Sequence, residues 1–299
     1  MTKSEMQDTT VLITGGNSGI GYATAEALAR RGAHVALVSR DAARGQAARD
    51  RLAAATGNPR IDVLQADLAA QAQVRRLAAT VQERYSRLDV VINNAGGFEP
   101  HRRLSPDGIE MTVAVNLVAP WLLTELLADR LRASAPARVV NVASGAADRA
   151  TLDLDDLQYE RRRYRAFGAY GQSKLALILI SNEQARRFAG SGVTVNSLHP
   201  GFVATNFGRR DPLTSLGWLV MRPFQIDAVA GAQTTLHVAT DPGLATVSGR
   251  YFSKQQPVAP NPIAEDAALA QRLWQMLETL TGATGPARAT GARSGGRAM

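Results

Sequence analysis

The sequence predicts a single α/β domain with a doubly wound, mostly parallel sheet of seven strands. Short apolar runs rich in β-forming residues alternate with alanine-, leucine- and arginine-rich stretches of helical pattern along most of the 299 residues. The apolar runs are continuous rather than alternating, which is typical of parallel strands covered by helices on both faces. In a domain of this class, ligands bind beyond the carboxyl ends of the strands.

The elements follow one another in a regular strand–helix order. Strand candidates are short apolar runs, and helix candidates are the longer amphipathic or alanine-rich stretches between them. The predicted strands span residues 10–14, 34–39, 61–65, 90–93, 138–142, 194–199 and 249–252. The predicted helices span about 19–31, 41–56, 70–86, 107–133, 169–189, 227–240 and 264–281.

Two segments fall outside this order, and the remainder forms one domain over residues 1–281. Residues 148–168 are polar and charged without a clear period, so we expect an inserted loop with a short helix. Residues 282–299 are rich in glycine, alanine, threonine and arginine, which predicts a disordered basic tail.

Composition excludes several classes of function. The chain has no cysteine, so disulfides and thiolate metal sites are excluded, and its four histidines lack metal-ligand spacing. The net charge of +8 comes from arginine. The basic–aromatic run 159–165 directly follows acidic residues, so we interpret this run as a solvated loop rather than a nucleic-acid site. No apolar run is long enough to span a membrane, and the first residues resemble neither a signal peptide nor a hydrophobic anchor. We therefore expect a cytoplasmic protein without a metal or a nucleic-acid partner.

The most informative pair of residues is Tyr170 and Lys174. They stand four residues apart in the run YGQSK, so both side chains lie on one face of the predicted helix. A free tyrosine has a pKa near ~10, and a lysine charge ~4 Å away at an effective dielectric of ~20 would lower this value by roughly three units. The phenol would then be a usable proton donor and acceptor near neutral pH. The alternative is a simple surface pair, which stands only if the chain offers no cofactor site.

A glycine-rich loop offers such a site directly after the first predicted strand. The run TGGNSGIG, residues 14–21, opens the following helix. Glycines at such a turn let the backbone approach a pyrophosphate, which then binds the helix N-terminus. The expected cofactor contacts in this loop are Gly15, Asn17, Ser18, Gly19, Ile20 and Gly21.

The end of the second predicted strand bears on which dinucleotide is bound. An acidic residue at this position would accept a hydrogen bond from the ribose 2′-hydroxyl, but Ser39 stands there and Arg40 follows it. A guanidinium matches a 2′-phosphate, so we favour NADP(H) over NAD(H). If Asp41 rather than Arg40 faces the ribose, this preference weakens. The alternative for Asp41, which we prefer, is an N-cap of the next helix.

At this point the chain resembles the short-chain dehydrogenase/reductase family, a family of Rossmann-type folds, over nearly its whole length. The resemblance rests on ordered motifs, which add Asp67-Leu68, Asn93-Asn94-Ala95-Gly96, Asn116, Ser144 and Pro200-Gly201 with Val203 and Thr205 to the two patterns above. It implies that Asp67 and Leu68 contact the adenine, and that Pro200, Gly201, Val203 and Thr205 hold the nicotinamide carboxamide. Asn94, Ala95 and Gly96 would also contact the cofactor.

The resemblance further implies a hydride-transfer reaction between the nicotinamide and a carbonyl or alcohol. In it, Tyr170 is the general acid and base, and Lys174 lowers the pKa of Tyr170 and binds the nicotinamide ribose. Ser144 binds the substrate oxygen, and Asn116 holds a water that continues the proton path from Lys174.

Details of the chain are similar to the retinol-dehydrogenase-like group of the family, and the glycine spacing excludes the family's extended branch. These details are the insertion before Tyr170, the run His199-Pro200-Gly201, and the run GRYF at 249–252. By the same resemblance, residues 202–225 form a substrate lid. The apolar side chains of this lid predict a hydrophobic small-molecule carbonyl or alcohol, although they could instead pack beneath the lid or form a subunit contact.

Two alternatives to an NADP(H)-dependent reductase remain at this point. One is an NAD-dependent alcohol dehydrogenase, and the other is a dinucleotide-sensing regulator without catalysis, which would be expected to lack Ser144, Tyr170 or Lys174. The assembly is left open between a homodimer and a homotetramer.

Overall fold

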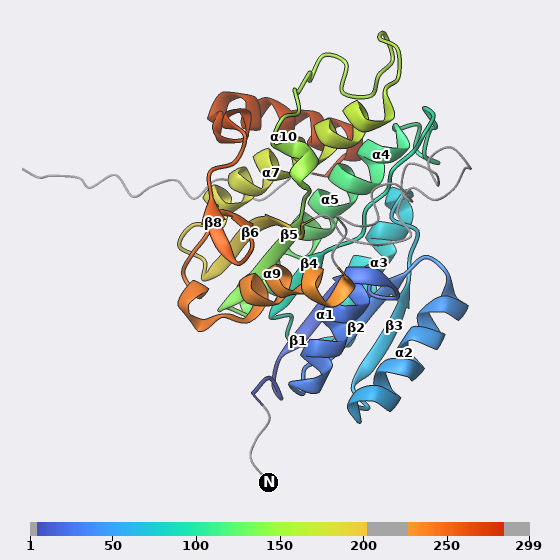
Figure 1. Cartoon of the computed structure of the whole chain (residues 1–299), viewed down its shortest axis with the longest axis vertical. Helices are drawn as coiled ribbons and strands as arrows, with labels where there is room; N and C mark the ends of the chain where they lie inside the picture. Colours follow the sequence, from blue (N-terminus) through green and yellow to red (C-terminus); the bar gives the residue numbers. More distant parts are fainter. Residues whose placement is uncertain (1–4, 202–226, 284–299) are drawn as a thin grey trace, which may run out of the picture.

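The computed structural model describes residues 5–201 and 227–283 and has the predicted doubly wound architecture (Figure 1). The strand order in the sheet is β3-β2-β1-β4-β5-β6-β7-β8, with all neighbouring pairs parallel except the last. The strands are β1 (Thr10–Thr14), β2 (His34–Ser39), β3 (Ile61–Gln65), β4 (Val90–Asn93), β5 (Ala137–Val142), β6 (Val193–His199), β7 (Tyr251–Ser253) and β8 (Gln256–Val258). From β1 the sheet grows through β2 to β3 on one side, and then continues with β4 on the other side of β1. A ligand crevice forms where the strand order changes in this way, at the carboxyl ends of β1 and β4.

Strand β8 is an addition to the seven predicted strands. It pairs antiparallel with β7 through a tight turn in which Lys254 and Gln255 both have positive φ, 48° and 64°. A turn with two positive φ values matches the twist of a hairpin. The sequence pattern did not reveal this strand because all three residues of β8 are exposed and one of them is Pro257.

Helices cover both faces of the sheet. They are α1 (Gly19–Arg30), α2 (Ala42–Thr56), α3 (Gln71–Arg84), α4 (Met111–Val113), α5 (Ala119–Leu126), α6 (Ala128–Ala133), α7 (Ala166–Arg187), α9 (Ala228–Thr240) and α10 (Ala267–Thr281). Helices α1, α2 and α9 share one apolar core with the sheet, and α3, α5, α7 and α10 share the other. The central strands of the sheet are therefore buried on both faces, which explains why they read as continuous apolar runs.

The long helix predicted over 107–133 is broken into several pieces. A π-helical turn, Ala114–Val118, links α4 to α5, and α5 gives way to α6 around Leu127. A π turn adds a residue to the helical repeat and changes the direction of its side chains. The irregular turn contains Asn116, which the sequence assigned to the active site.

The insertion 148–168 contains turns instead of the short helix expected before α7. Its polar backbone folds around the carboxylate of Asp156, whose Oδ1 accepts hydrogen bonds from the amides of Glu160 at 2.7 Å and Arg161 at 3.1 Å. Backbone amides that donate to a side-chain carboxylate in this way are not available for helical hydrogen bonds, which disfavours a helix here.

None of the helices in the described part of the chain is long and apolar enough to cross a membrane. Among the same residues, no cluster of three or more histidine, aspartate or glutamate side chains could hold a metal ion.

Candidate active site

The glycine-rich loop between β1 and α1 is packed too tightly for side chains. Gly15 and Gly19 have positive φ, 67° and 54°. A Cβ on Gly21 would lie 2.4 Å from the carbonyl oxygen of Gly15, which is shorter than real contacts allow. The loop thus forms a cradle of bare backbone at the N-terminus of α1, where backbone amides and the helix dipole favour an anion. The predicted contacts Asn17, Ser18 and Ile20 lie in the same loop and first turn.

The run that follows β4 braces this cradle from the neighbouring strand. Asn94 donates through Nδ2 to the carbonyl oxygens of Thr14 at 2.9 Å and Gly15 at 3.4 Å. The hydroxyl of Thr14 in turn accepts from the amides of Asn94 and Ala95, both at 3.0 Å. The ends of β1 and β4 are therefore held together at the crevice, and the predicted residues Asn94, Ala95 and Gly96 lie there.

At the end of β2, the structure assigns Asp41 to helix capping. Oδ1 of Asp41 accepts a hydrogen bond from the amide of Arg44 at 2.9 Å, and Asp41 is the N-cap of α2. The hydroxyl of Ser39 donates to the carbonyl of Asp41 at 2.8 Å. Arg40, between them, is exposed. The interpretation of Asp41 as an N-cap is confirmed, because its carboxylate is already engaged with α2.

Asp67 and Leu68 lie just beyond the end of β3, as the sequence predicts. The carboxylate of Asp67 accepts from the amide of Ala69 at 3.0 Å, and the amide of Asp67 donates to Oε1 of Gln73 at 2.9 Å. Leu68 packs against the core beneath them. These contacts fix the turn that borders the crevice on the β3 side.

The structure brings Ser144 and Tyr170 into contact from two different elements. Ser144 follows β5 and accepts from the amide of Ala146 at 3.2 Å, and Tyr170 lies in the second turn of α7. The Ser144 hydroxyl lies close enough to the phenol of Tyr170 to act on its pKa. Burial raises the pKa of Tyr170, and the Ser144 hydroxyl acts in the opposite direction.

Lys174 lies in the same crevice but does not lower the pKa of Tyr170 in the protein alone. Its ammonium donates to the carbonyl oxygen of Val142 at 2.8 Å, and its side chain is buried. Burial lowers the pKa of Lys174 to about 8. The expected strong lowering of the tyrosine pKa therefore does not appear, because removal of the phenol from water outweighs other effects.

Asn116 lies close to this lysine across Gly96. A Cβ on Gly96 would lie 3.4 Å from both Oδ1 of Asn116 and Nζ of Lys174. The side chain of Asn116 is fixed by the backbone of Gly97, accepting from its amide at 2.7 Å and donating to its carbonyl at 2.9 Å. It also donates to the hydroxyl of Ser173 at 3.0 Å. Four sequence-predicted residues, Ser144, Tyr170, Lys174 and Asn116, thus gather beside the glycine cradle.

Sequence reasoning missed the residues that hold the loop after Ser144. The hydroxyl of Tyr251, on β7, donates to Oδ1 of Asp148 at 3.2 Å and lies 3.5 Å from the carbonyl oxygen of Ser144. The side-chain amide of Asn261 donates to the carbonyls of Ala147, Asp148 and Ala150 at 2.9–3.3 Å. Both donors lie more than one hundred residues away in the chain, and no local pattern marks them.

His199 belongs to the same edge of the site. Its Nδ1 accepts from the amide of Gly201 at 3.2 Å, and burial lowers its pKa while the charge of Asp148 acts against this. Pro200 and Gly201 therefore follow the end of β6 at the crevice, as predicted. Val203, Thr205 and the predicted lid over 202–225 lie outside the described residues, as does the predicted tail beyond residue 283.

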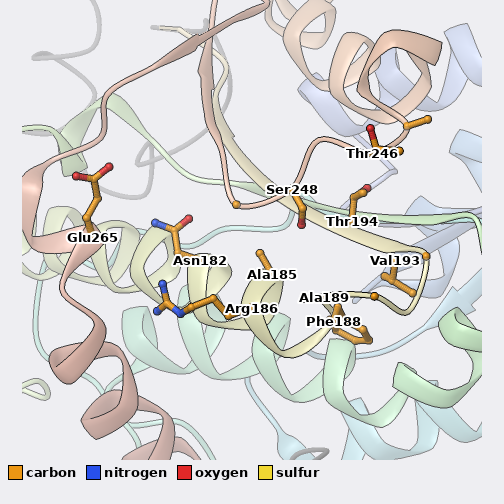
Figure 2. A pocket seen from close by; sticks show the side chains of 14 residues that line it. Asn182, Ala185, Arg186, Phe188, Ala189, Val193, Thr194, Thr246, Ser248 and Glu265 are labelled. Carbon is orange, nitrogen blue, oxygen red and sulfur yellow. The ribbon is translucent and has the colours of Figure 1, made fainter. Parts of the chain in front are cut away.

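A separate hollow of about 710 Å³ contains none of these residues (Figure 2). It lies between the C-terminal end of α7, the beginning of β6 and the loop before β7. Two of its polar side chains are engaged within the protein, since Asn182 donates to the carbonyl of Ala264 at 2.8 Å and Arg186 pairs with Glu183 at 2.8 Å. The candidate active site is therefore the crevice at the carboxyl ends of the strands.

A glycine cradle at a helix N-terminus, set beside a neighbouring serine and tyrosine and a buried lysine, defines a dinucleotide-dependent oxidoreductase of the Rossmann type. The family model for short chain dehydrogenases matches residues 9–214. This chain belongs to the short-chain dehydrogenase/reductase family.

Similar proteins cover nearly the same length. Human retinol dehydrogenase 13 is 40% identical over 295 residues, which cover 95% of this chain and 88% of that protein. Human retinol dehydrogenase 12 is 40% identical over 281 residues, covering 94% and 89%.

Solved structures agree with the fold. An uncharacterized protein from Mycobacterium paratuberculosis has a TM-score of 0.77 and 34% identity, covering 96% of this chain and 99% of that one. RhlG from Pseudomonas aeruginosa, in a complex with NADP at its active site, has a TM-score of 0.68 and 28% identity, covering 84% and 97%. The protein is thus an NAD(P)(H)-dependent oxidoreductase similar to retinol dehydrogenases.

Proposed function

We propose that this chain is an NADP(H)-dependent reductase of hydrophobic aldehydes or ketones, with Tyr170 as the proton donor to the carbonyl oxygen. The observation that carries the proposal is the gathering of Ser144, Tyr170, Lys174 and Asn116 beside the glycine cradle, with Ser144 near enough to the phenol of Tyr170 to act on its pKa. The resemblance to retinol dehydrogenases supports a hydrophobic substrate.

The residues of the crevice fit a bound dinucleotide. The cradle that a Cβ on Gly21 would fill lies at the N-terminus of α1, and the first turn of α1 contains no acidic residue. A pyrophosphate would be held there by backbone amides. When bound, the nicotinamide supplies the hydride to the carbonyl carbon. Lys174, whose ammonium is 2.8 Å from the carbonyl of Val142, would hold the nicotinamide ribose.

The proton steps follow from the hydrogen bonds of the site. The hydroxyls of Ser144 and Tyr170 would both donate to the substrate oxygen, replacing their contact with each other. As negative charge develops on this oxygen, the two donors stabilise it, and Tyr170 transfers its proton. The raised pKa of Tyr170 keeps the phenol protonated at neutral pH, which suits a proton donor. The positive charge of Lys174 would stabilise the phenolate that remains, and Asn116 would hold a water through which the proton is restored.

The preference for the phosphorylated cofactor rests on Arg40. Arg40 and Asp41 are both exposed, but the carboxylate of Asp41 is engaged in capping α2 through a hydrogen bond of 2.9 Å, which leaves Arg40 to meet a ribose phosphate. A guanidinium–phosphate contact contributes about 1.5–3 kcal/mol, or roughly a 10- to 150-fold preference. We expect Arg40→Ala to weaken NADPH binding by this factor and to leave NADH binding nearly unchanged.

The test has two parts. A series of hydrophobic aldehydes, ketones and secondary alcohols is screened with NADPH and NADH by nicotinamide absorbance, and both cofactors are titrated into wild type and Arg40→Ala. Arg49→Ala, at an arginine of α2 that pairs with Asp50 at 2.9 Å, is the matched control. Absence of turnover with every carbonyl and alcohol would refute the reaction. Equal affinities of wild type for NADPH and NADH would instead make NAD(H) the working cofactor.

A further inference from the structure

We propose that Tyr251 and Asn261 are positioning residues for the reaction, because they hold the loop that carries Ser144 in place beside Tyr170. This inference rests on the proposed function, and it makes the C-terminal part of the chain a support of the active site. We call residues 144–150 the serine loop. Its first residue comes two positions after the end of β5.

The serine loop does not fix its own position. It contains a single 3₁₀ turn over Gly145–Ala147. Three of its amides donate to carbonyl oxygens of the same loop at 3.0–3.2 Å, namely those of Ala147, Asp148 and Ala150. These bonds shape the loop but do not tie it to α7, which carries Tyr170. The position of Ser144 beside Tyr170 therefore depends on contacts with other elements.

Helix α7 limits how closely the serine loop approaches. Gly171 follows Tyr170 directly, and a Cβ at Gly171 would lie 3.0 Å from the carbonyl oxygen of Ala146 and 3.3 Å from Cβ of Ala150. The helix and the loop therefore meet with no side chain of Gly171 between them. Such a contact resists approach much more than separation, because the attraction between individual atom pairs is weak. A restraint from another element is needed to keep the loop there.

Tyr251 supplies one such restraint from β7. Its ring lies in the apolar core shared with α7, and the next residue, Phe252, lies in the other core, as expected for successive residues of a strand. Tyr251 is 3% exposed, and its hydroxyl donates to Oδ1 of Asp148 at 3.2 Å and lies 3.5 Å from the carbonyl oxygen of Ser144. Burial and the charge of Asp148 raise the pKa of Tyr251, so the phenol stays protonated and remains a donor.

Asn261 supplies the second restraint. Its Nδ2 donates to three carbonyl oxygens of the serine loop at 2.9–3.3 Å. Its Oδ1 accepts from the amide of Ile263 at 3.1 Å, which fixes the side chain at the start of the short turn before α10. The serine loop is thus tied to β7 and to the segment before α10 while it rests against α7. A catalytic group displaced by about 1 Å can lose roughly 100-fold in rate, so these ties bear directly on Ser144.

The inference is tested with variants that remove single hydrogen-bonding groups. kcat, KM and the Kd for NADPH are measured for wild type, Tyr251→Phe and Asn261→Ala, with a carbonyl substrate that wild type reduces. Both changes are also made in a Ser144→Ala background. Tyr85→Phe is the matched control, since Tyr85 is also a buried phenol that donates to an aspartate, Asp62, at 2.7 Å. Thermal unfolding establishes that each variant is folded at the assay temperature.

We expect each change to lower kcat by roughly 10-fold and to alter KM and the Kd for NADPH less than about twofold, because a displaced Ser144 weakens binding of the transition state only. In the Ser144→Ala background the same change should alter kcat less than about twofold, since an effect that acts through the Ser144 hydroxyl has nothing left to act on. A full loss of kcat that persists in this background would overturn the inference. So would an unchanged kcat in either single variant, or an equal loss in Tyr85→Phe.

Variants of Asp148 separate positioning from charge. Asp148→Asn keeps Oδ1 as an acceptor for the phenol of Tyr251 but removes the charge, and Asp148→Ala removes both. We expect Asp148→Asn to keep kcat within about twofold of wild type and Asp148→Ala to lower it as much as Tyr251→Phe does. An equal loss in the two Asp148 variants would overturn the inference, because charge rather than position would then control the rate.

A failure of the proposed reaction remains distinguishable, because the restraint on the serine loop is also measured without substrate. Amide hydrogen exchange of a peptide covering residues 144–150 is followed in wild type, Tyr251→Phe, Asn261→Ala and Tyr85→Phe. If wild type reduces no carbonyl, faster exchange of this peptide in the first two variants and not in Tyr85→Phe would support the role of Tyr251 and Asn261 in holding Ser144. Exchange equal to that of wild type in Tyr251→Phe and Asn261→Ala would overturn it.

Discussion

The glycine cradle makes a prediction that does not depend on knowing the substrate. In Gly21→Ala the new Cβ would lie 2.4 Å from the carbonyl oxygen of Gly15 and 2.5 Å from Nδ2 of Asn94. The first neighbour is backbone, so the loop must move. Alanine gains about 1 kcal/mol in helix propensity, but overpacking costs about 1–3 kcal/mol, so the net loss is up to about 2 kcal/mol and should lower Tm by up to roughly 3 °C.

The loss of cofactor affinity should exceed the loss of stability. The displaced amides of the cradle are those that would bind the pyrophosphate, so we expect the Kd for NADPH to rise at least about 10-fold, or about 1.4 kcal/mol. Titration by fluorescence and thermal unfolding measure the two effects. Gly57→Ala is the control, because Gly57 has a φ of 68° and an added Cβ there would meet no atom within 4 Å. It should cost about 1–2 kcal/mol through its left-handed backbone and leave Kd unchanged. Unchanged Tm and Kd in Gly21→Ala would refute the reasoning.

Two further predictions concern buried titratable groups. Burial lowers the pKa of Lys174 to about 8, so the buried ammonium costs stability at pH 7. Lys174→Met removes this cost but leaves the carbonyl of Val142 without its hydrogen bond. The free energy of unfolding should therefore rise by a net of about 1–2 kcal/mol at pH 7. The same variant should bind NADPH more weakly; a variant that is less stable yet binds NADPH normally would contradict this. Burial also raises the pKa of Glu125 from 4.5 to about 7, despite its hydrogen bond from Gln184. The folded state then holds the proton more tightly than the unfolded state, so the free energy of unfolding falls as the pH rises from about 4.5 to 7. Glu125→Gln should reduce this fall by about 1–3 kcal/mol. An unchanged pH dependence in denaturant titrations would contradict the prediction.

The sheet and the motif residues could be predicted because their signals are local. The apolar runs located β1 to β4 at their observed bounds, and in β1, β2 and β4 both faces of the strand are buried. The exposed β8 and the π turn around Asn116 left no such signal. Helix capping by Asp41 was predicted because a cap depends on residues only three positions apart.

The chemistry of the site was less accessible because it depends on distant contacts. Tyr251 and Asn261 hold the loop after Ser144 from more than one hundred residues away. The orientation of the Lys174 ammonium toward Val142 is set by packing of α7 on β5, and the four-residue spacing from Tyr170 does not encode it. The pKa of Tyr170 is therefore raised by burial, where spacing alone predicted a lowered value.

The central claim is that Tyr170 donates the proton during hydride transfer, and single-turnover kinetics of Tyr170→Phe test it most directly. With a confirmed carbonyl substrate and saturating cofactor, the rate should fall at least about 100-fold, while the Kd for the cofactor changes less than about threefold. Tyr85→Phe, which removes a phenol bonded to Asp62 at 2.7 Å on another part of the fold, should keep the wild-type rate. A Tyr170→Phe variant that turns over at nearly the wild-type rate would contradict the account.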